Sequence, residues 1–365
     1  MKHRDRVAAA LRHVEPDRCP LQVYFTPEFA ELLRMDLAIP PECMVDDADG
    51  GSRYQLEIAV DQDLLLTAVG WHSEYGRPAD RYLDEWGVGW VAQPYETPFG
   101  GGRYFEPVGH PLAVDAAVDK YVAPDPDRPE LYREAERLMR DFGGEYWIVG
   151  ATVRTIWETS WALRGFEQML MDLKSDPELV DAILEIPFRY HLAVAEQLTR
   201  MGVDMIWTGD DIGTQTGMLF SPDLWRHFLK PRMAEFIARL KAINPEIKIA
   251  YHSDGDVRAV IPELIEIGVD VLHPVQPACM DLADLKTRYG DRLCFWGSVD
   301  SQFTLPFGSP DDVRKEVLSR LETVGIDGGL IIGPPRVQLD TPMENFWAMV
   351  RTVRETPYAS FGRSD

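Results

Sequence analysis

Short apolar runs alternate with longer stretches of mixed polarity along this chain. The runs are rich in Val, Ile, Leu and aromatic residues and have no polar face, which is typical of parallel strands buried between helices and a core. The longer stretches repeat their apolar residues at helical spacing. The pattern predicts eight strands, over residues 20–26, 63–69, 146–152, 203–208, 247–251, 269–273, 293–296 and 328–332.

Several helix starts are marked by a capping side chain followed directly or nearly directly by proline. These capping residues are Ser221, Ser309 and Asp340. Thr341 and Glu344 also have the spacing of a capping box. Pro231 lies inside the first of the predicted helices and is expected to kink it. The predicted helices span residues 222–243, 256–267, 281–289, 310–324 and 342–355, and residues 165–201 are expected to form two helices broken near SDPE.

Eight strands, most of them followed by a helix, predict a (β/α)₈ barrel that occupies residues 1–365 as a single domain. The first twenty residues are expected to add a short amphipathic helix as an N-terminal extension. Residues 80–112 break the rhythm with aromatic runs around a GGG turn. They predict a β-hairpin insertion after the second strand, which serves either as a lid over the barrel mouth or as a plain surface loop.

Composition narrows the classes of protein that the chain can be. The 365 residues carry a formal net charge of −23, which disfavours nucleic acids and anionic membranes as partners. No apolar run approaches the ~20 residues of a membrane span, and the N-terminus lacks an apolar signal core, so we expect a cytoplasmic protein. The four cysteines, among them Cys43, show no CxxC spacing, and the common nucleotide-binding, hydrolase and zincin motifs are missing.

Ionisable and aromatic residues gather just after the predicted strands. In a barrel these positions converge on one mouth, where the chemistry takes place. The residues at the strand ends are Arg154, Trp157, Glu158, Trp207, Asp210, Asp211, Tyr251, His252, Asp254, His273, Trp296 and Arg336. Their repetition at strand after strand predicts an active mouth.

His252 and Asp254 follow the fifth predicted strand in the sequence YHSDGD. Residues two apart in a strand point to the same side, so the imidazole and the carboxylate are expected to face one way. The pair can ligate a divalent metal, or Asp254 can orient His252 for general acid–base work. A hydrogen-bonded pair that only stiffens the loop is the structural alternative.

Other polar groups at the mouth have two interpretations each. The adjacent carboxylates Asp210 and Asp211 repel unless a cation or hydrogen-bond donors intervene, so one is expected to cap a turn and the other to reach the pocket. Glu158 can act as a base or as a ligand. Arg154 and Arg336 can hold an anionic substrate group or pair with these acids.

The aromatic residues at the strand ends can stack on a planar ligand, although packing explains them as well. His273 likewise has a structural alternative. We expect catalytic roles for Glu158, Asp211 and His252, and metal ligation by His252, Asp254 and Asp211. Substrate contacts are expected from Arg154, Trp157, Trp207, Tyr251, His273, Trp296 and Arg336.

The chain also resembles the uroporphyrinogen decarboxylase family in its broad sense, which includes cobalamin-dependent methyltransferases. The resemblance covers nearly the whole chain, in the segments RDRVAAALRHVEPDRCPL, LRGFEQMLMDLKSDPELV, SPDLWRHFLKPRM and GGLIIGPPRVQLDTPMENFWAMVRTVRE. The last segment is the most specific, with a glycine-led strand followed by DTPxEN. The resemblance implies a (β/α)₈ barrel, the fold that the strand pattern predicts independently.

This chain departs from the porphyrinogen decarboxylases of the family near the N-terminus. Those enzymes carry an arginine-rich segment, roughly RQAGRY, that grips the substrate carboxylates. The matching region here reads LQVYFTPEFAELL, with no arginine before Arg34. The resemblance is therefore closer to the methyltransferase-like members.

The second departure concerns a metal. The thiol-methylating members of the family bind zinc through His-x-Cys and a distant Cys. His252 matches the histidine, but Asp254 stands at the first cysteine position, and GPPRVQ has no cysteine near the second. The resemblance thus implies a divalent metal, zinc first among the candidates, that is a harder Lewis acid than one held by thiolates.

Such a metal would polarise an oxygen, for example the ether oxygen that becomes an alkoxide or phenolate as a methyl group departs. The expected function is methyl transfer from a small O-methylated substrate, such as a methoxylated aromatic, to the cobalt of a separate corrinoid protein. The partner is needed because the chain shows no cobalamin-binding domain of its own. Two alternatives remain: a metal-free decarboxylase of a carboxylated substrate, and a non-catalytic barrel that binds a ligand.

Overall fold

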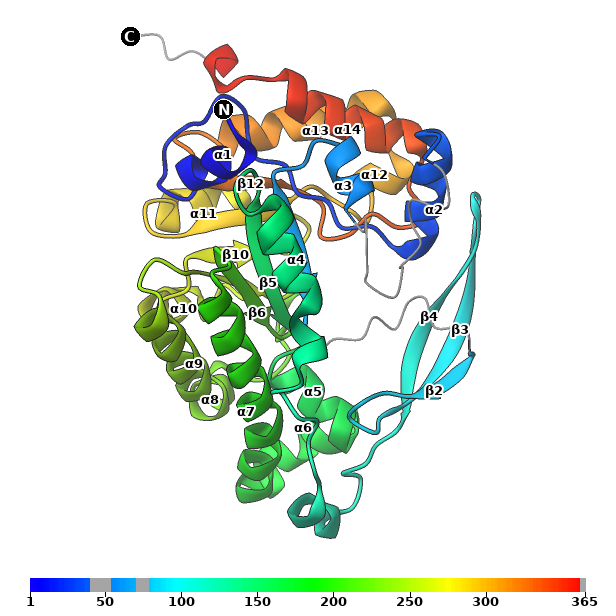
Figure 1. The fold of residues 1–365 in the computed structure, drawn as a ribbon, viewed down its shortest axis with the longest axis vertical. Coiled ribbons are helices and arrows are strands. Elements are labelled where there is room, and N and C mark those ends of the chain that lie inside the picture. The colour runs from blue at the N-terminus through cyan, green and yellow to red at the C-terminus, as the bar shows by residue number, and fades with distance from the viewer. Residues whose placement is uncertain (40–53, 70–78, 362–365) are drawn as a thin grey trace.

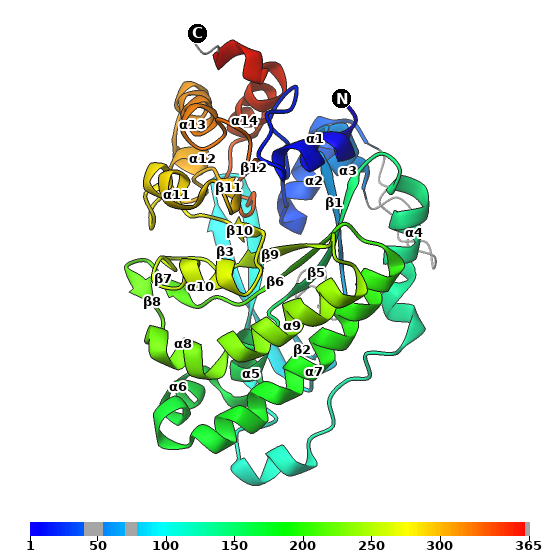
Figure 2. The same cartoon turned by 90° about the vertical axis from the view of Figure 1, so that its left-hand side faces the viewer.

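A computed structural model describes residues 1–39, 54–69 and 79–361, so Cys43 lies outside the described residues. Seven parallel strands form one curled sheet in the order β1-β5-β6-β9-β10-β11-β12 (Figures 1 and 2). Helices surround this sheet, and the architecture is an α/β barrel of the TIM type. The strands are β1 (Leu64–Ala68), β5 (Trp147–Val153), β6 (Met205–Gly209), β9 (Lys248–His252), β10 (Val271–His273), β11 (Cys294–Ser298) and β12 (Leu330–Gly333).

The segment 20–26 was predicted to be a strand of the barrel. It occupies that place, but it does not form a regular strand. The segment is extended and forms only isolated parallel bridges, from Leu21 to Ile332 and from Phe25 to Val337. On its other side, the Leu21 N–H donates to the Asp63 carboxylate at 2.7 Å. Side chains thus replace part of the regular ladder, and the segment still lies between β12 and β1, where it closes the barrel.

The helices follow the strands much as the sequence predicts. The long stretch 165–201 divides at Asp176, whose side chain caps the second of its two helices. None of the helices in the described ranges combines the length and the apolar character that a membrane span needs. The helices of the barrel are α4 (Arg133–Phe142), α5 (Trp157–Arg164), α6 (Phe166–Ser175), α7 (Pro177–Met201), α8 (Pro222–Phe228), α9 (Lys230–Ile243), α10 (Ile261–Glu266), α11 (Leu282–Tyr289), α12 (Thr304–Phe307), α13 (Pro310–Thr323) and α14 (Met343–Glu355). The N-terminal helices are α1 (His3–Ala10), α2 (Pro27–Asp36) and α3 (Gln55–Ala59), and short 3₁₀ helices span Asp115–Lys120, Pro129–Tyr132 and Tyr358–Phe361.

Three helix details differ from the prediction. The helix expected to kink at Pro231 breaks into α8 and α9, with that proline in the first turn of α9, where its missing N–H costs nothing. The helix predicted from residue 256 begins only at Ile261. The capping box forms at Ser309 and Asp312, whereas α14 starts after Pro342 without a side-chain cap, so the box predicted around Thr341 is wrong.

The insertion is a three-stranded antiparallel sheet rather than a simple hairpin. It consists of β2 (Arg81–Leu83), β3 (Gly89–Thr97) and β4 (Gly100–Gly109), in that order across the sheet. Figure 1 shows it on the side of the barrel opposite α9 and α10. A further two-stranded ribbon, β7 (Gly213–Thr214) with β8 (Gly217–Met218), follows β6.

Strand alternation divides the core into two layers. Alternate residues such as Met205, Ala250 and Val271 fill the barrel interior, and Val7 of α1 packs into the same cluster. The residues between them, such as Ile249, pack outward against the helices. The same alternation decides which side chains at the strand ends reach the mouth.

Candidate metal centre and active site

A cavity of about 560 Å³ lies at the carboxyl ends of the strands. Its walls come from the segments that follow β5, β6, β9, β10, β11 and β12, and the insertion adds Trp90 and Phe105. Of the predicted site residues, those that line it are Arg154, Glu158, Trp207, Asp211, His252, Asp254, His273 and Arg336.

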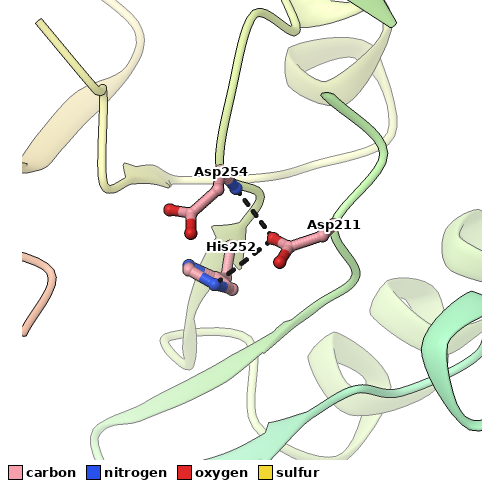
Figure 3. A group of neighbouring side chains, drawn as sticks. All are labelled: Asp211, His252 and Asp254. Carbon is pink, nitrogen blue, oxygen red and sulfur yellow. Dashed lines mark hydrogen bonds and ion pairs between the residues drawn. The ribbon is translucent and has the colours of Figure 1, made fainter. Parts of the chain in front are cut away.

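Three of these residues form a group that can hold a metal ion. Asp211, His252 and Asp254 each offer a ligand atom, and these atoms lie within 4.8 Å of one another. His252 Nε2 is 3.5 Å from Asp211 Oδ1, and the Asp254 N–H donates to the same oxygen at 2.8 Å. Figure 3 shows Asp211 reaching toward the His252 ring from one loop, with Asp254 beside it on the next. The structure thus brings together the imidazole and carboxylates that the sequence analysis paired.

Glycines allow the two loops that carry this group to approach backbone to backbone. Gly209, at the end of β6, has a φ of +125°, and a Cβ there would collide with the backbone of His252. A Cβ on Gly213 would likewise collide with the backbone oxygen of Asp254. The Ile212 N–H also donates to the Ser253 hydroxyl at 3.1 Å. This close approach places Asp211 beside the histidine.

The His252 ring packs against two other rings, those of His273 and Trp207. Its Nδ1 lies 2.8 Å from Nδ1 of His273, the last residue of the neighbouring strand. Trp207 contacts both imidazoles edge-to-face, with ring centroids 5.6 and 5.0 Å away. Burial, and secondarily the neighbouring imidazole, lowers the pKa of His273 well below its usual value, so this ring is neutral at physiological pH.

A further acid, Glu158, lies beside the group of Asp211, His252 and Asp254. Burial, reinforced by the Asp211 carboxylate, raises the pKa of Glu158 well above its usual value, although Arg154 opposes the shift. The pKa of Asp254 is also raised, first by partial desolvation and then by the Asp211 carboxylate, while His252 opposes the shift; the Asp254 side chain itself is exposed to solvent. The negative charge of Asp211 thus disfavours the charged forms of Glu158 and Asp254, an effect that a bound cation would counteract.

Asp210 has a structural task instead. It is buried, and it accepts hydrogen bonds from the N–H groups of Ile156 and Glu158 at 2.9–3.0 Å, which fixes the start of α5. Burial raises its pKa to about 6. Of the two adjacent carboxylates, Asp210 thus caps the turn and Asp211 reaches the cavity, in the division that the sequence predicts.

Arg154 stands in the cavity between two indole rings. Its guanidinium carbon lies 5.1 Å from the Trp90 ring of the insertion and 5.9 Å from the Trp161 ring of α5. Its Nε is 3.7 Å from Glu158 Oε1, and its φ of +62° is unusual for a residue with a side chain. Arg336 stacks on Tyr24 at 5.4 Å. The cavity thus carries two cations on aromatic supports.

Three predicted substrate contacts are not brought to the cavity. Trp157 is buried against Phe220, with ring centroids 4.9 Å apart, and Tyr251 points outward to the helix layer, beside Trp225. Trp296 lies in the barrel interior beneath the cavity floor. Their predicted contact with substrate is therefore corrected to a packing role. Four aromatic residues that the sequence analysis did not name line the cavity instead: Tyr24, Trp90, Phe105 and Trp161. Trp90 and Phe105 belong to the aromatic runs of the insertion, which were the only sequence signal for any of the four.

A protein family described as Uroporphyrinogen decarboxylase (URO-D) matches residues 101–356. Among curated relatives, the methylcobamide:CoM methyltransferase MtaA of Methanosarcina barkeri is 29% identical over 184 residues, about half the length of each chain. The protein of the same name from M. barkeri strain Fusaro is 25% identical and covers 68% of this chain and 70% of its own. A uroporphyrinogen decarboxylase from Chlorobaculum tepidum is 22% identical, with coverage of 59% and 61%.

Among solved structures, a methyltransferase from Methanosarcina mazei matches with a TM-score of 0.71 at 21% identity. The alignment covers 97% of this chain and 99% of the other. At this level of identity the likeness establishes the fold.

Proposed function

The chain belongs to the uroporphyrinogen decarboxylase (URO-D) family, and from its site we propose that it is a methyltransferase acting on a small O-methylated compound. The methyl acceptor would be the cobalt of a separate corrinoid protein. The names of the MtaA relatives, which act on methylcobamide, support methyl transfer with a corrinoid. The observation that carries the proposal is the group of Asp211, His252 and Asp254 on the cavity wall.

The donor set fits a divalent metal ion. One imidazole nitrogen and two carboxylate oxygens are common ligands of catalytic zinc, and adjacent carboxylates are stabilised by a cation between them. Among the described cysteines, Cys19, Cys279 and Cys294 are buried, and none belongs to the cavity lining. When bound here, such an ion would supply Lewis-acid stabilisation of the charge that develops on the departing oxygen.

The protein's own groups would complete the reaction. The bond between the methyl carbon and oxygen breaks, its electron pair stays on oxygen, and that oxygen then needs a proton. Glu158 lines the same cavity, and burial raises its pKa well above its usual value, which favours the protonated form that a proton donor needs. We assign it the role of general acid.

The cavity walls favour an aromatic substrate. Trp90, Phe105, Trp161 and Trp207 present rings to the same space in which the metal ligands lie. Such rings bind a planar molecule by stacking and exclude water from the reacting centre. A methoxylated aromatic compound fits these walls better than a small aliphatic ether.

A decarboxylase is the second candidate, favoured by Arg154 and Arg336 in the cavity and by the decarboxylases among the relatives. Two guanidinium groups can hold a substrate carboxylate. This reaction would need no metal, so the metal content of active protein separates the two candidates.

The test is a demethylation assay with a reduced corrinoid protein and a panel of methoxylated aromatics and aliphatic methyl ethers. We expect methyl transfer to cobalt, seen as the change in its absorption spectrum, with at least one aromatic member of the panel. His252→Ala is expected to abolish that transfer. Failure of the wild-type protein across the panel, together with release of CO₂ from a carboxylated compound, would favour the second candidate.

A further inference from the structure

Two imidazoles stand side by side at the floor of the cavity. His252 ends β9 and His273 ends β10, and the two residues are paired directly in the parallel register of these strands. Alternation turns both side chains toward the barrel axis. Their Nδ1 atoms are 2.8 Å apart, and their ring planes are inclined by 41°.

This contact restricts where the protons can be. A hydrogen bond between two ring nitrogens needs one N–H donor and one nitrogen with a free lone pair. The two Nδ1 atoms can therefore share only one proton. Whichever histidine accepts must be neutral, with its own proton on Nε2.

The surroundings of His252 decide the direction. Its Nε2 is the atom that faces Asp211, at 3.5 Å, whereas its Nδ1 faces His273, so Nε2 is the nitrogen turned toward the other possible metal ligands. A metal ion binds a lone pair, so the proton of the neutral His252 ring must be on Nδ1 when Nε2 is a ligand. His252 then donates and His273 accepts.

We propose that His273 is a positioning residue that holds His252 in the Nδ1–H tautomer and aims its Nε2 at the metal site. The inference rests on the proposed metal centre and assigns His273 a role other than substrate binding. Metal-bound histidines usually donate their second N–H to a carboxylate or a carbonyl oxygen. A neutral imidazole in that place orients His252 without adding negative charge beside Asp211, Asp254 and Glu158.

His273 is itself held in place by packing. Its exposed fraction is 2%, and its ring lies between Trp207 and Trp296, with centroids at 5.0 and 4.8 Å. The Trp296 N–H in turn donates to the Gln22 side chain at 3.1 Å. These contacts fix the position and plane of the His273 ring, as a positioning role requires.

Zinc affinity, measured by competition with a chromophoric chelator, tests this role without any activity assay. His273→Leu removes the acceptor and is expected to weaken zinc binding by about 10–100-fold, the usual effect of losing such a partner. His273→Asn places an amide oxygen near the former Nδ1 position and is expected to restore most of the affinity. Val271→Ala, two residues earlier on the same inward face of β10, is the control for a general loss of packing and is expected to bind zinc like the wild type.

Wild-type affinity in His273→Leu, or equal weakening in both His273 variants, would overturn the inference. If His273→Leu does not fold, nitrogen-15 NMR of the zinc-loaded wild type decides: a protonated Nδ1 on His252 supports the role, and zinc bound to that Nδ1 overturns it. A wild-type protein that takes up no zinc also overturns it. Zinc binding with the expected order of variants but no demethylation leaves the inference standing and counts against the proposed function alone.

Discussion

The Asp211 carboxylate has two neighbours at once, the backbone N–H of Asp254 and the imidazole of His252. It also lies close enough to Glu158 to raise the pKa of that group. These contacts make Asp211 the residue that connects Glu158 to the candidate metal ligands. Loss of its charge should therefore affect both metal binding and protonation in the cavity.

We predict that Asp211→Asn lowers zinc affinity by more than about tenfold, because one of three charged or strongly donating ligands becomes a neutral amide. Isothermal titration calorimetry measures the change. Asp300→Asn is the matched control, since Asp300 lines the same cavity outside the group of three and its turn hydrogen bonds can be kept by an asparagine oxygen. Equal affinities in Asp211→Asn and the wild type would remove Asp211 from the site.

Strand alternation predicts the closeness of His252 and Asp254, and the two are close in the structure, although β9 ends at His252 and Asp254 follows in the loop. The same alternation excludes Tyr251, which directly precedes His252 and points outward. Trp157 was misplaced for another reason: it begins α5, and the sequence does not show which way the chain turns after β5. Asp211 lies close to His252 because glycines let the loops after β6 and β9 approach backbone to backbone. A pattern within one segment of the sequence does not reveal such a contact between two loops.

At the scale of elements, the insertion adds a wall to the cavity. Trp90 comes from β3 and Phe105 from β4, and both are almost fully buried. Trp90 also packs on the Arg154 guanidinium. The insertion thus contributes directly to the surface that a substrate meets.

We predict that Phe105→Ala raises the KM for a methylated aromatic substrate by about tenfold with little change in kcat, because a stacking contact acts on bound substrate and transition state alike. Steady-state kinetics over a range of substrate concentrations gives both constants. Tyr104→Ala is the control: this neighbour on β4 has an exposed fraction of 44% and is not part of the lining. A fall in kcat without a change in KM would contradict the wall role.

The existence of the insertion was predictable from its glycine turn and aromatic runs, and its third strand was not. β2 has only three residues, too few for a periodic signal. The irregularity of segment 20–26 could not be predicted from the sequence either. Its apolar pattern placed it correctly next to β12, but the side chains of Gln62 and Asp63 occupy hydrogen-bonding positions that a regular strand would use.

For the whole molecule, closure of the barrel depends on a buried charge at the end opposite the cavity. Asp63 is fully buried and accepts hydrogen bonds from Arg6 at 2.6 Å, Arg18 at 2.7 Å and His3 at 2.8 Å. It also receives the Leu21 N–H. One carboxylate therefore ties α1, the closing segment and β1 together.

This carboxylate should make stability depend on pH. Burial alone would raise the pKa of Asp63, but the hydrogen bond from His3 and the charges of Arg18 and Arg6 hold it below its usual range. An acid with a depressed pKa stabilises the folded state above its unfolded pKa of about 4, and that stabilisation is lost as the pH falls through the folded value.

We predict that Asp63→Asn lowers the free energy of unfolding at pH 7 by about 3–5 kcal/mol, because two buried guanidinium groups lose the fully buried carboxylate that they share and keep only the partly exposed Asp17 and Asp61. The variant should also lose less stability than the wild type as the pH falls below about 4. Urea unfolding at several pH values measures both effects. Asp223→Asn, which removes a side chain that is 90% exposed and paired with Arg226, should cost below about 1 kcal/mol. Parallel pH curves for the wild type and Asp63→Asn would contradict the prediction.

Elemental analysis of the purified protein tests the proposed metal centre most directly. The group of Asp211, His252 and Asp254 predicts about one equivalent of zinc or another divalent metal per chain. That metal should fall to a trace in His252→Ala and stay unchanged in His227→Ala, where an exposed histidine of α8 is removed. Wild-type protein that is free of metal and still transfers methyl groups at its full rate would contradict the central claim.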